Sequence, residues 1–285
     1  MTQFRSIEPR DWDLVELRRA MANLSDARVL VVGDVGLDRY TVGSVERISP
    51  EAPVPIVAVT EELHKLGLAA NVADNVHALG ASAQLCGVIG RDVAGAQLTQ
   101  ILSGLGMSPS GLVRDSSRRT TLKERVVSER QQLLRIDYET TTALSAKIER
   151  EFFGKVQQAL GKCQVAIVED YAKGLLSSAS MKRVFAAAKK KGRKVAVDPN
   201  ARTPLASYRG AWLLTPNTRE AEALTGIEIR DLASLEKAGK LILDETHASH
   251  LVITRGKDGM ALFSRESRDR ILIPTTAREV YDVSG

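Results

Sequence analysis

Short, continuous apolar runs recur along the chain and predict buried β-strands. Each run is rich in Val, Ile or Leu and is bounded by polar residues or glycine, a pattern typical of strands covered on both faces. The runs are Arg28–Gly33, Ala83–Gly90, Gln164–Glu169, Lys194–Asp198, Ala211–Thr215 and His250–Thr254.

Amphipathic stretches of helical length separate most of these strands. Examples are Ser145–Leu160, Ser177–Lys191 and Leu232–Thr246. Strands that alternate with helices predict an α/β fold with a mostly parallel sheet covered by helices on both faces. Ligands of such sheets bind at the carboxyl ends of the strands, so candidate site residues are sought there.

Two segments depart from this alternation and predict a small second sheet. Residues Ile48–Glu62 contain three prolines and then alternate, which suits an edge strand, and Arg119–Glu139 resembles a hairpin of alternating apolar and charged residues. We expect a β lid, from about 40–62 and 112–139, within a single domain of residues 1–285. A small sheet with an exposed edge favours pairing with another copy, so we expect a homodimer. That pairing would bury an alternating apolar face, made of Leu122, Val126 and Leu134.

The composition and charge of the chain limit its possible partners and its compartment in three ways. The net charge is +5, but the dense basic run Lys189–Lys194 ends a helical pattern, where cations complement the helix dipole, so we do not interpret it as a nucleic-acid site. Cys86 and Cys163 each lie in an apolar run, which indicates buried free thiols and a reducing compartment. No apolar run approaches membrane-spanning length and no signal core is evident, so we expect a cytoplasmic protein without a membrane partner.

Two motifs in the first third of the chain could bind a ligand. Asp34 and Asp38 follow the first strand, where carboxylates could accept hydrogen bonds from a polyhydroxylated ligand, although Gly and Asp are also common in turns. Next, "LGLAANVADNV" predicts a helix opened by Gly67 and carrying Asn71. Small residues would let the backbone approach a ligand there, but an Ala-rich packed helix is the alternative.

Polar clusters follow three later strands. Their members are Asp170, Lys173, Asp198, Asn200, Arg202, Asn217 and Glu220. Each cluster alone could be a loop or a cap, and "NTRE" reads as a helix start. Together they provide the carboxylates, amides and cations that a phosphate and Mg²⁺ site requires.

The segment "VITRGKDGMALF" predicts two strands joined by a glycine-containing turn. It could be a plain hairpin, or Gly256 and Gly259 could let the backbone lie against a flat nucleotide. The sequence contains no Walker A motif and no G-x-G-x-x-G after a strand, which argues against a dinucleotide-binding dehydrogenase. It also lacks H-E-x-x-H and Cys/His clusters, which argues against a transition-metal site.

The motifs "GDVGLD", "GLAAN", "DPNAR", "NTRE", "TRGKDG" and "DVSG", in this order, resemble the ribokinase-like (PfkB) family of carbohydrate kinases. Within it, "VERISPEAPVPIV", "LGLAANVADNVHALGA" and "VEDYAKG" are similar to the D-glycero-β-D-manno-heptose 7-phosphate kinases of Gram-negative bacteria. The resemblance implies a ribokinase-like three-layer sandwich with a β lid. It also implies ATP- and Mg²⁺-dependent phosphorylation of the C1 hydroxyl of heptose 7-phosphate, on the way to ADP-heptose and lipopolysaccharide core. A monovalent cation is a further candidate cofactor.

The resemblance also implies a role for each candidate residue. Lys173 would act at the catalytic centre. The sugar phosphate would be bound by Asp34, Asp38, Gly67, Asn71, Lys123, Arg125 and Asp170. ATP would be bound by Asp198, Asn200, Arg202, Asn217, Thr218, Arg219, Glu220, Thr254, Arg255, Gly256 and Gly259. Glu220 would hold Mg²⁺ through water.

The last residues, "DVSG", resemble the first half of the family signature Asp-Thr-x-Gly-Ala-Gly-Asp. Asp282 and Gly285 match it, and Gly285 would begin the anion hole, but the catalytic Asp of the signature would lie beyond Gly285. We therefore expect the C-terminal part of the domain to be missing and a chain ending there to be incompetent. Many relatives carry a fused adenylyltransferase domain, which is not seen here, so we expect the single-function kinase. The alternatives are another sugar or nucleoside kinase of the family, or a non-catalytic sugar-binding relative.

Overall fold

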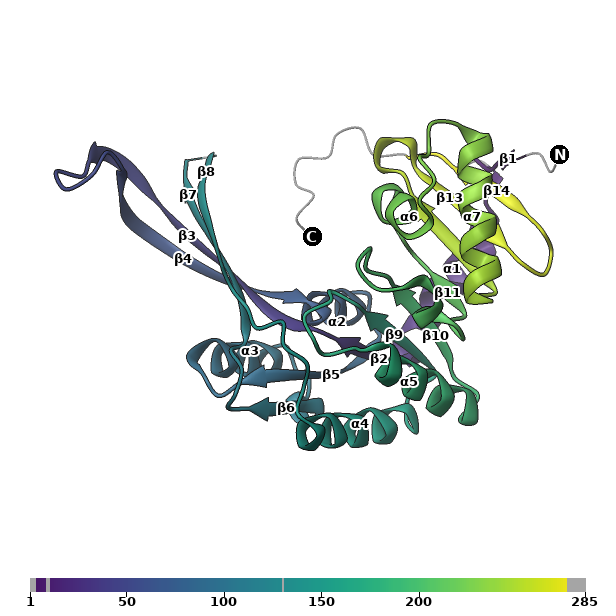
Figure 1. The fold of residues 1–285 in the computed structure, drawn as a ribbon, viewed down its shortest axis with the longest axis horizontal. Helices are drawn as coiled ribbons and strands as arrows, with labels where there is room; N and C mark the ends of the chain where they lie inside the picture. The colour runs from purple at the N-terminus through teal and green to yellow at the C-terminus, as the bar shows by residue number, and fades with distance from the viewer. Residues whose placement is uncertain (1–3, 9–10, 130, 276–285) are drawn as a thin grey trace.

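The computed structural model describes residues 4–8, 11–129 and 131–275. Within these ranges the larger sheet has ten strands, and a second, four-stranded sheet extends away from the main body at the left of Figure 1. In spatial order the larger sheet consists of β1 (Arg5–Ser6), β14 (Arg270–Ile273), β13 (Met260–Ser264), β12 (His250–Thr254), β11 (Leu213–Leu214), β10 (Lys194–Asp198), β9 (Val165–Glu169), β2 (Arg28–Gly33), β5 (Ser82–Gly90) and β6 (Leu112–Asp115).

The larger sheet is mostly parallel, as the alternation of strands and helices predicts. All neighbours from β12 to β6 pair in parallel, whereas β13 pairs antiparallel with both β12 and β14. The predicted strands are confirmed with small boundary shifts. The exception is Ala211–Thr215, of which only Leu213–Leu214 forms a strand, because a turn ends at Ala211 and Pro216 lacks an N–H for the ladder.

Helices cover the sheet in two layers, as the cores on its two faces indicate. They are α2 (Ala69–Ala78), α3 (Val93–Gly104), α4 (Ala146–Leu160), α5 (Ser178–Lys190), α6 (Thr218–Thr225) and α7 (Leu232–Thr246), whereas α1 (Leu14–Ala22) has no buried residue. Alternate residues of β2 enter different cores, since a strand's side chains point to opposite faces. Leu30 lies in the core shared with α4, α5 and α7, and Val31 in the core shared with α2 and α3.

Helix starts agree with the sequence pattern because polar caps mark them. Ser145 caps α4, and Ser177 caps α5 through a capping box with Ser180. Lys189 and Lys190 form the basic last turn of α5, as expected. Both cysteines are free and buried. No helix in the described ranges is long and apolar enough to cross a bilayer.

The lid is a mixed sheet in the order β4 (Pro55–Leu68), β3 (Val35–Ile48), β7 (Thr121–Ser128) and β8 (Gln131–Tyr138). It confirms the predicted second sheet, and its long strands project from the body in Figure 1. Its limits differ from the prediction: β3 and β4 extend beyond 40–62, and Leu112–Asp115 pairs with β5 in the larger sheet. Burial explains the second difference, because Val113 of this strand belongs to the main core.

Gly67 does not open a helix, which corrects the prediction. It lies near the end of β4 opposite Gly36, and α2 begins two residues later, after Leu68 turns the backbone with a φ of 55°. A side chain at Gly67 would place its Cβ 2.7 Å from Oδ2 of Asp38. The glycine is therefore required for the close approach of Asp38.

Candidate active site

The carboxyl ends of the central parallel strands place three candidate segments side by side. Gly33 at the end of β2 lies opposite Glu169 at the end of β9, and Glu169 lies opposite Asp198 at the end of β10. The predicted clusters thus meet at one edge of the sheet because parallel strands end on the same side. This edge is the candidate active site, with the lid rooted at one end of it.

Asp34 occupies the single position between β2 and β3. Its carboxylate is buried and its Oδ2 accepts a hydrogen bond of 3.1 Å from the backbone N–H of Lys173. The carbonyl of Asp34 accepts one of 3.0 Å from the N–H of Ala69, the first residue of α2. Burial is the main reason that the pKa of Asp34 rises to about 6, with a smaller contribution from the charge of Asp170 and an opposing one from the Lys173 N–H.

The root of the lid brings the other sugar-binding candidates to Asp38. Nη1 of Arg125 lies 2.5 Å from Oδ1 of Asp38, and both side chains are largely buried. Lys123 faces Asp38 directly in the β3–β7 register, and its Nζ lies 5.9 Å from the ring centre of Tyr171. Burial lowers the pKa of Lys123, whereas the Asp38 charge raises it. Arg125 is therefore neutralised by Asp38, and Lys123 is the better placed to meet an added anion.

Lys173 connects the loop after β9 to the lid. Its ammonium forms an ion pair with Glu139, which follows β8. Nη2 of Arg118 donates to the carbonyls of both Lys173 and Thr140, each at 2.9 Å. The sequence pattern did not single out Glu139, Arg118 or Tyr171, because their partners lie far away along the chain.

Asp170 is buried and fully engaged within the protein. Its Oδ2 accepts hydrogen bonds from the hydroxyls of Tyr208 at 2.7 Å and Thr203 at 2.6 Å, and its Oδ1 accepts one from the N–H of Ala172. The carboxylate joins the loop after β9 to the loop after β10. In this arrangement it holds the two loops together, and its contact with the sugar phosphate, which the family resemblance implies, stays a prediction.

The far half of the edge gathers carboxyl groups. Burial raises the pKa of Glu169 to about 8, and the nearby charges of Asp198 and Glu220 add to the rise. Burial likewise raises the pKa of Asp198 to about 6, helped by Glu220 and opposed by a hydrogen bond from Thr215. Carboxylates that repel one another in this way gain from a cation placed among them. Glu169 was missed in the sequence, although a carboxylate as the last residue of a buried strand was a usable signal.

No group of three or more His, Cys, Asp or Glu side chains in the described part of the chain is arranged to hold a metal ion by itself. This is compatible with Mg²⁺, which commonly binds through one or two carboxylates, substrate phosphates and several waters. Among the candidates, Asp198 and Glu220 offer such carboxylates.

The start of α6 confirms that "NTRE" is a helix cap. Oδ1 of Asn217 accepts from the N–H of Glu220 at 3.0 Å, and Oε2 of Glu220 accepts from the N–H of Asn217 at 2.9 Å. Thr218 Oγ1 donates to the carbonyl of Thr254 at 3.2 Å, which holds α6 against the end of β12. Arg202 and Arg219 are exposed beside these loops. Asn200 accepts through Oδ1 from the N–H of Arg202, so this amide forms a local turn.

The segment from Thr254 to Gly259 is a hairpin turn, one of the two predicted forms. Arg255 donates its N–H to the carbonyl of Gly259 at 2.8 Å. Gly256 and Gly259 have positive φ angles of 56° and 78°, and a Cβ on Gly259 would stand 2.0 Å from the carbonyl oxygen of Ile273. The turn alone thus explains both glycines, and their contact with a nucleotide stays a prediction.

Two groups of candidates remain. Asn71 is half-buried on α2 and makes no side-chain hydrogen bond within the described residues, so its amide is free for a ligand. Asp282 and Gly285 lie outside the described residues.

Residues 26–285 match the sequence profile of the pfkB family carbohydrate kinases. The chain belongs to this family. It is a sugar kinase, and the expected α/β fold is confirmed by similarity to solved kinases. The tetrameric inhibited form of phosphofructokinase-2 from Escherichia coli superposes with a TM-score of 0.71 and 19% identity, covering 90% of this chain and 83% of that one. Ribokinase of Arabidopsis thaliana, complexed with ribose and ATP, gives 0.69 and 17%, covering 91% and 81%.

Closer similarity in sequence is found among bacterial proteins named bifunctional protein HldE. The protein of Pelobacter propionicus is 44% identical over 259 residues, covering 91% of this chain and 53% of its own length. That of Geobacter metallireducens is 43% identical over 264 residues, covering 93% and 54%. The chain thus spans about half the length of the curated relatives that it matches.

Proposed function

We propose that this sugar kinase transfers the γ-phosphoryl group of ATP to the C1 hydroxyl of D-glycero-D-manno-heptose 7-phosphate. The product would be D-glycero-β-D-manno-heptose 1,7-bisphosphate, an intermediate on the way to ADP-heptose and lipopolysaccharide core in the cytoplasm. The observation that carries the proposal is that Lys123 faces Asp38 at the root of the lid, on the strand that begins directly after the buried Asp34. Carboxylates suit sugar hydroxyls, and a half-buried cation beside them suits a substrate that already carries a phosphate. The similarity to HldE proteins supports the same substrate class.

Each side chain at the sugar end has a distinct task in this proposal. Asp34 and Asp38 accept hydrogen bonds from hydroxyl groups, and the amide of Asn71 both donates and accepts. Lys123 binds the 7-phosphate. Arg125 holds Asp38 in place through their ion pair, and a direct contact of Arg125 with the sugar phosphate stays a prediction.

The nucleotide end would bind ATP with Mg²⁺. Asp198 and Glu220 are the carboxylates that would hold the hydrated ion, and the ion would neutralise phosphate charge when bound. Arg202 and Arg219 supply positive charge for phosphate oxygens, and Lys173 would do so on exchanging its ion pair with Glu139 for a phosphate. The turn from Thr254 to Gly259 would lie against the nucleotide. One phosphofructokinase-2 structure is described in complex with potassium, so activity should be compared in potassium and sodium salts.

The test of substrate class is a comparison of phosphate acceptors. Heptose 7-phosphate should be phosphorylated with a much higher kcat/KM than ribose, fructose 6-phosphate or a nucleoside. Lys123→Met should raise KM for heptose 7-phosphate at least about tenfold, since it removes a charge-assisted contact, and should leave KM for ATP unchanged. A higher kcat/KM for another sugar would contradict heptose 7-phosphate as the substrate and identify that sugar instead. Binding of ligands without phosphorylation of any acceptor would favour a non-catalytic relative.

We also propose that two copies pair through their lids. Leu122 of the predicted apolar face is buried in the core shared with α2 and α3, which corrects its place in that face. Leu134 of the predicted face and Val59 of β4 are exposed by 55% and 53%, and a thin sheet gains stability when such side chains are covered. Leu134→Lys should convert the dimer to a monomer in multi-angle light scattering. Lys257→Glu, an exposed charge change on the β12–β13 turn, is the control. A monomeric wild-type protein at micromolar concentration contradicts the pairing.

A further inference from the structure

A second hollow lies at the opposite edge of the larger sheet from the candidate active site. It has a volume of about 690 Å³ and is formed by α5 together with the chain around the starts of β10, β11 and β12. Lys194 begins β10 and Asp198 ends it, so the hollow is roughly 13 Å from the catalytic edge, since a strand rises about 3.3 Å per residue. A volume of this size is typical of small-molecule sites.

The charges that line this hollow are all positive. Lys182, Lys189, Arg193, Lys194 and Arg209 line it, and no carboxylate of the described residues does. Arg209 is paired with Glu245 outside the lining, whereas the other four have no ion pair with any described carboxylate. Water can solvate the charge of an exposed lysine, so an unpaired lysine needs no ligand. Nε of Arg193, in contrast, is buried and has no hydrogen-bond partner among the described residues.

The floor of the hollow is apolar and partly aromatic. Phe185, Val195 and Trp212 contribute to it, and Nζ of Lys194 lies 4.4 Å from the ring centre of Trp212. A cationic rim above an aromatic floor suits a ligand that combines phosphate groups with a flat apolar part.

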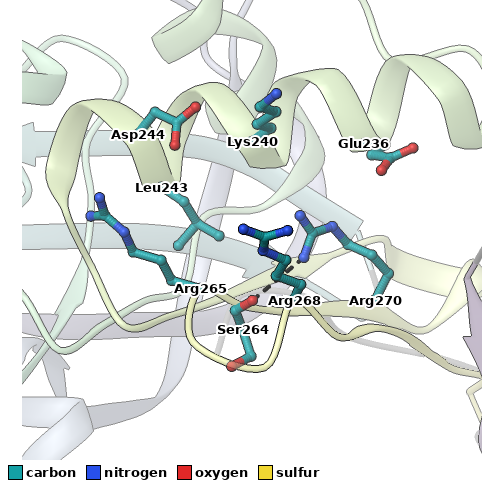
Figure 2. Close-up of a pocket in the computed structure, with 8 residues that line it drawn as sticks. All are labelled: Glu236, Lys240, Leu243, Asp244, Ser264, Arg265, Arg268 and Arg270. Carbon is teal, nitrogen blue, oxygen red and sulfur yellow. Dashed lines mark hydrogen bonds between the residues drawn. The ribbon is translucent and has the colours of Figure 1, made fainter. Parts of the chain in front are cut away.

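The neighbouring hollow differs in one decisive respect. Figure 2 shows it between α7 and the β13–β14 turn, where Lys240, Arg265, Arg268 and Arg270 share the lining with Glu236 and Asp244. Its carboxylates offset part of the positive charge, and Nη1 of Arg270 donates to the carbonyls of Ser264 and Asp269. Nε of Arg270, like Nε of Arg193, is buried without a partner among the described residues, so the uncompensated charge and not the guanidinium distinguishes the two hollows. The linings of the two hollows are in contact, because Arg265 of this hollow is hydrogen-bonded to His247 of the first. Positive charge without internal compensation is therefore concentrated beside Trp212.

We propose that the hollow beside Trp212 binds a nucleotide, as a second site separate from the one used in catalysis. The phosphates contact Lys182, Lys189 and Arg193, and the base lies on the apolar floor near Trp212. This assignment gives part of the basic run Lys189–Lys194, which begins in the last turn of α5, a ligand in addition to its effect on the helix dipole. It does not depend on which sugar the kinase phosphorylates.

Trp212 provides a local reporter of binding. The chain has two tryptophans, so a Trp12→Phe background leaves Trp212 as the sole emitter. Titration with ATP without Mg²⁺, at constant ionic strength, should change its fluorescence saturably. Tripolyphosphate, which has the charge but no base, should bind at least about fivefold more weakly.

Matched charge changes test the location. Lys182→Gln/Lys189→Gln removes two exposed lysines from the rim and should weaken ATP at this site at least about tenfold. Lys190→Gln/Lys191→Gln removes the same charge from residues that do not line the hollow. It should change the affinity of the hollow for ATP less than about twofold. Arg193→Gln, checked for folding by circular dichroism, should weaken ATP similarly to the first pair. The proposal fails if Trp212 shows no saturable change, if both double variants weaken ATP equally, or if tripolyphosphate binds as tightly as ATP.

Discussion

The two halves of the candidate active site are built differently. The sugar half is held by contacts between distant segments: Asp38 pairs with Arg125 of another lid strand, and the loop of Lys173 is tied to Glu139 beyond β8. The nucleotide half is made of local motifs, namely the Asn217–Glu220 capping box and the turn around Gly256. Damage to the sugar half should therefore affect the whole lid root, whereas damage to the nucleotide half should stay local.

The largest expected effect comes from the buried ion pair of the sugar half. Arg125→Met should lower the free energy of unfolding by about 3 kcal/mol, because the Asp38 carboxylate would be left buried and unpaired. Asp38→Asn added to this variant should recover at least about half of the loss. Urea unfolding monitored by circular dichroism measures both.

The matched control lies on the same lid. Arg135 and Asp137 also form an ion pair, but their side chains are exposed by 45% and 34%, so Arg135→Met should cost less than about 1 kcal/mol. If Arg125→Met costs no more than Arg135→Met, the sugar half does not depend on its buried pair.

The pH dependence of stability should report on Asp34. Its pKa is about 6 in the folded protein, against an ordinary value of 3.8 for an aspartate in water, so between these values the unfolded chain binds fewer protons than the folded one. This group then lowers the free energy of unfolding as pH rises from about 4 to about 6, by up to about 1.4 kcal/mol per pH unit, and has no further effect above that. Asp34→Asn should therefore gain stability relative to wild type across this window. A difference that is constant from pH 4 to pH 7 would show that burial does not perturb Asp34.

Asn71 tests whether the sugar half also binds through α2. Asn71→Ala should weaken sugar phosphate binding by about 1–3 kcal/mol, because a buried hydroxyl loses its partner, and should leave ATP affinity unchanged. Asn75→Ala, at an exposed position of the same helix, is the control. Calorimetric titration with each substrate separates the effects, and an equal loss of ATP affinity would contradict the placement of Asn71 on the sugar side.

The smallest effect is expected at the cap of α6. Asn217→Ala should lower the free energy of unfolding by about 1 kcal/mol, whereas Asn217→Ser keeps a capping oxygen and should cost little. Because both variants lose the amide, both should raise KM for ATP if Asn217 binds the nucleotide. Normal ATP kinetics in the serine variant would leave Asn217 with a capping role alone.

The local features of the nucleotide half could be predicted from the sequence, whereas the long-range contacts of the sugar half could not. The strand ends that carry Asp198, Asn217 and Thr254 were found from local patterns, because an apolar run followed by a polar cluster needs only neighbouring residues. Gly67 was placed wrongly for the same reason: a small-residue stretch next to an Ala-rich helix looks like its first turn. Its actual requirement is the close approach of Asp38 across two strands, which no local pattern encodes.

By itself, the sequence determined the alternation of strands and helices, the capped helix starts, the parallel sheet and the edge at which the functional residues meet. Hydrophobic periodicity and capping act over a few residues, so they can be read along the chain. Only the tertiary structure decided that Arg125 neutralises Asp38, that Asp170 joins two loops and that Glu169 lies in a cluster of carboxylates. It also decided that part of the basic run at the end of α5 surrounds an aromatic floor. Burial and charge pairing depend on which distant segments come together, and that is settled when the sheet and its helices pack.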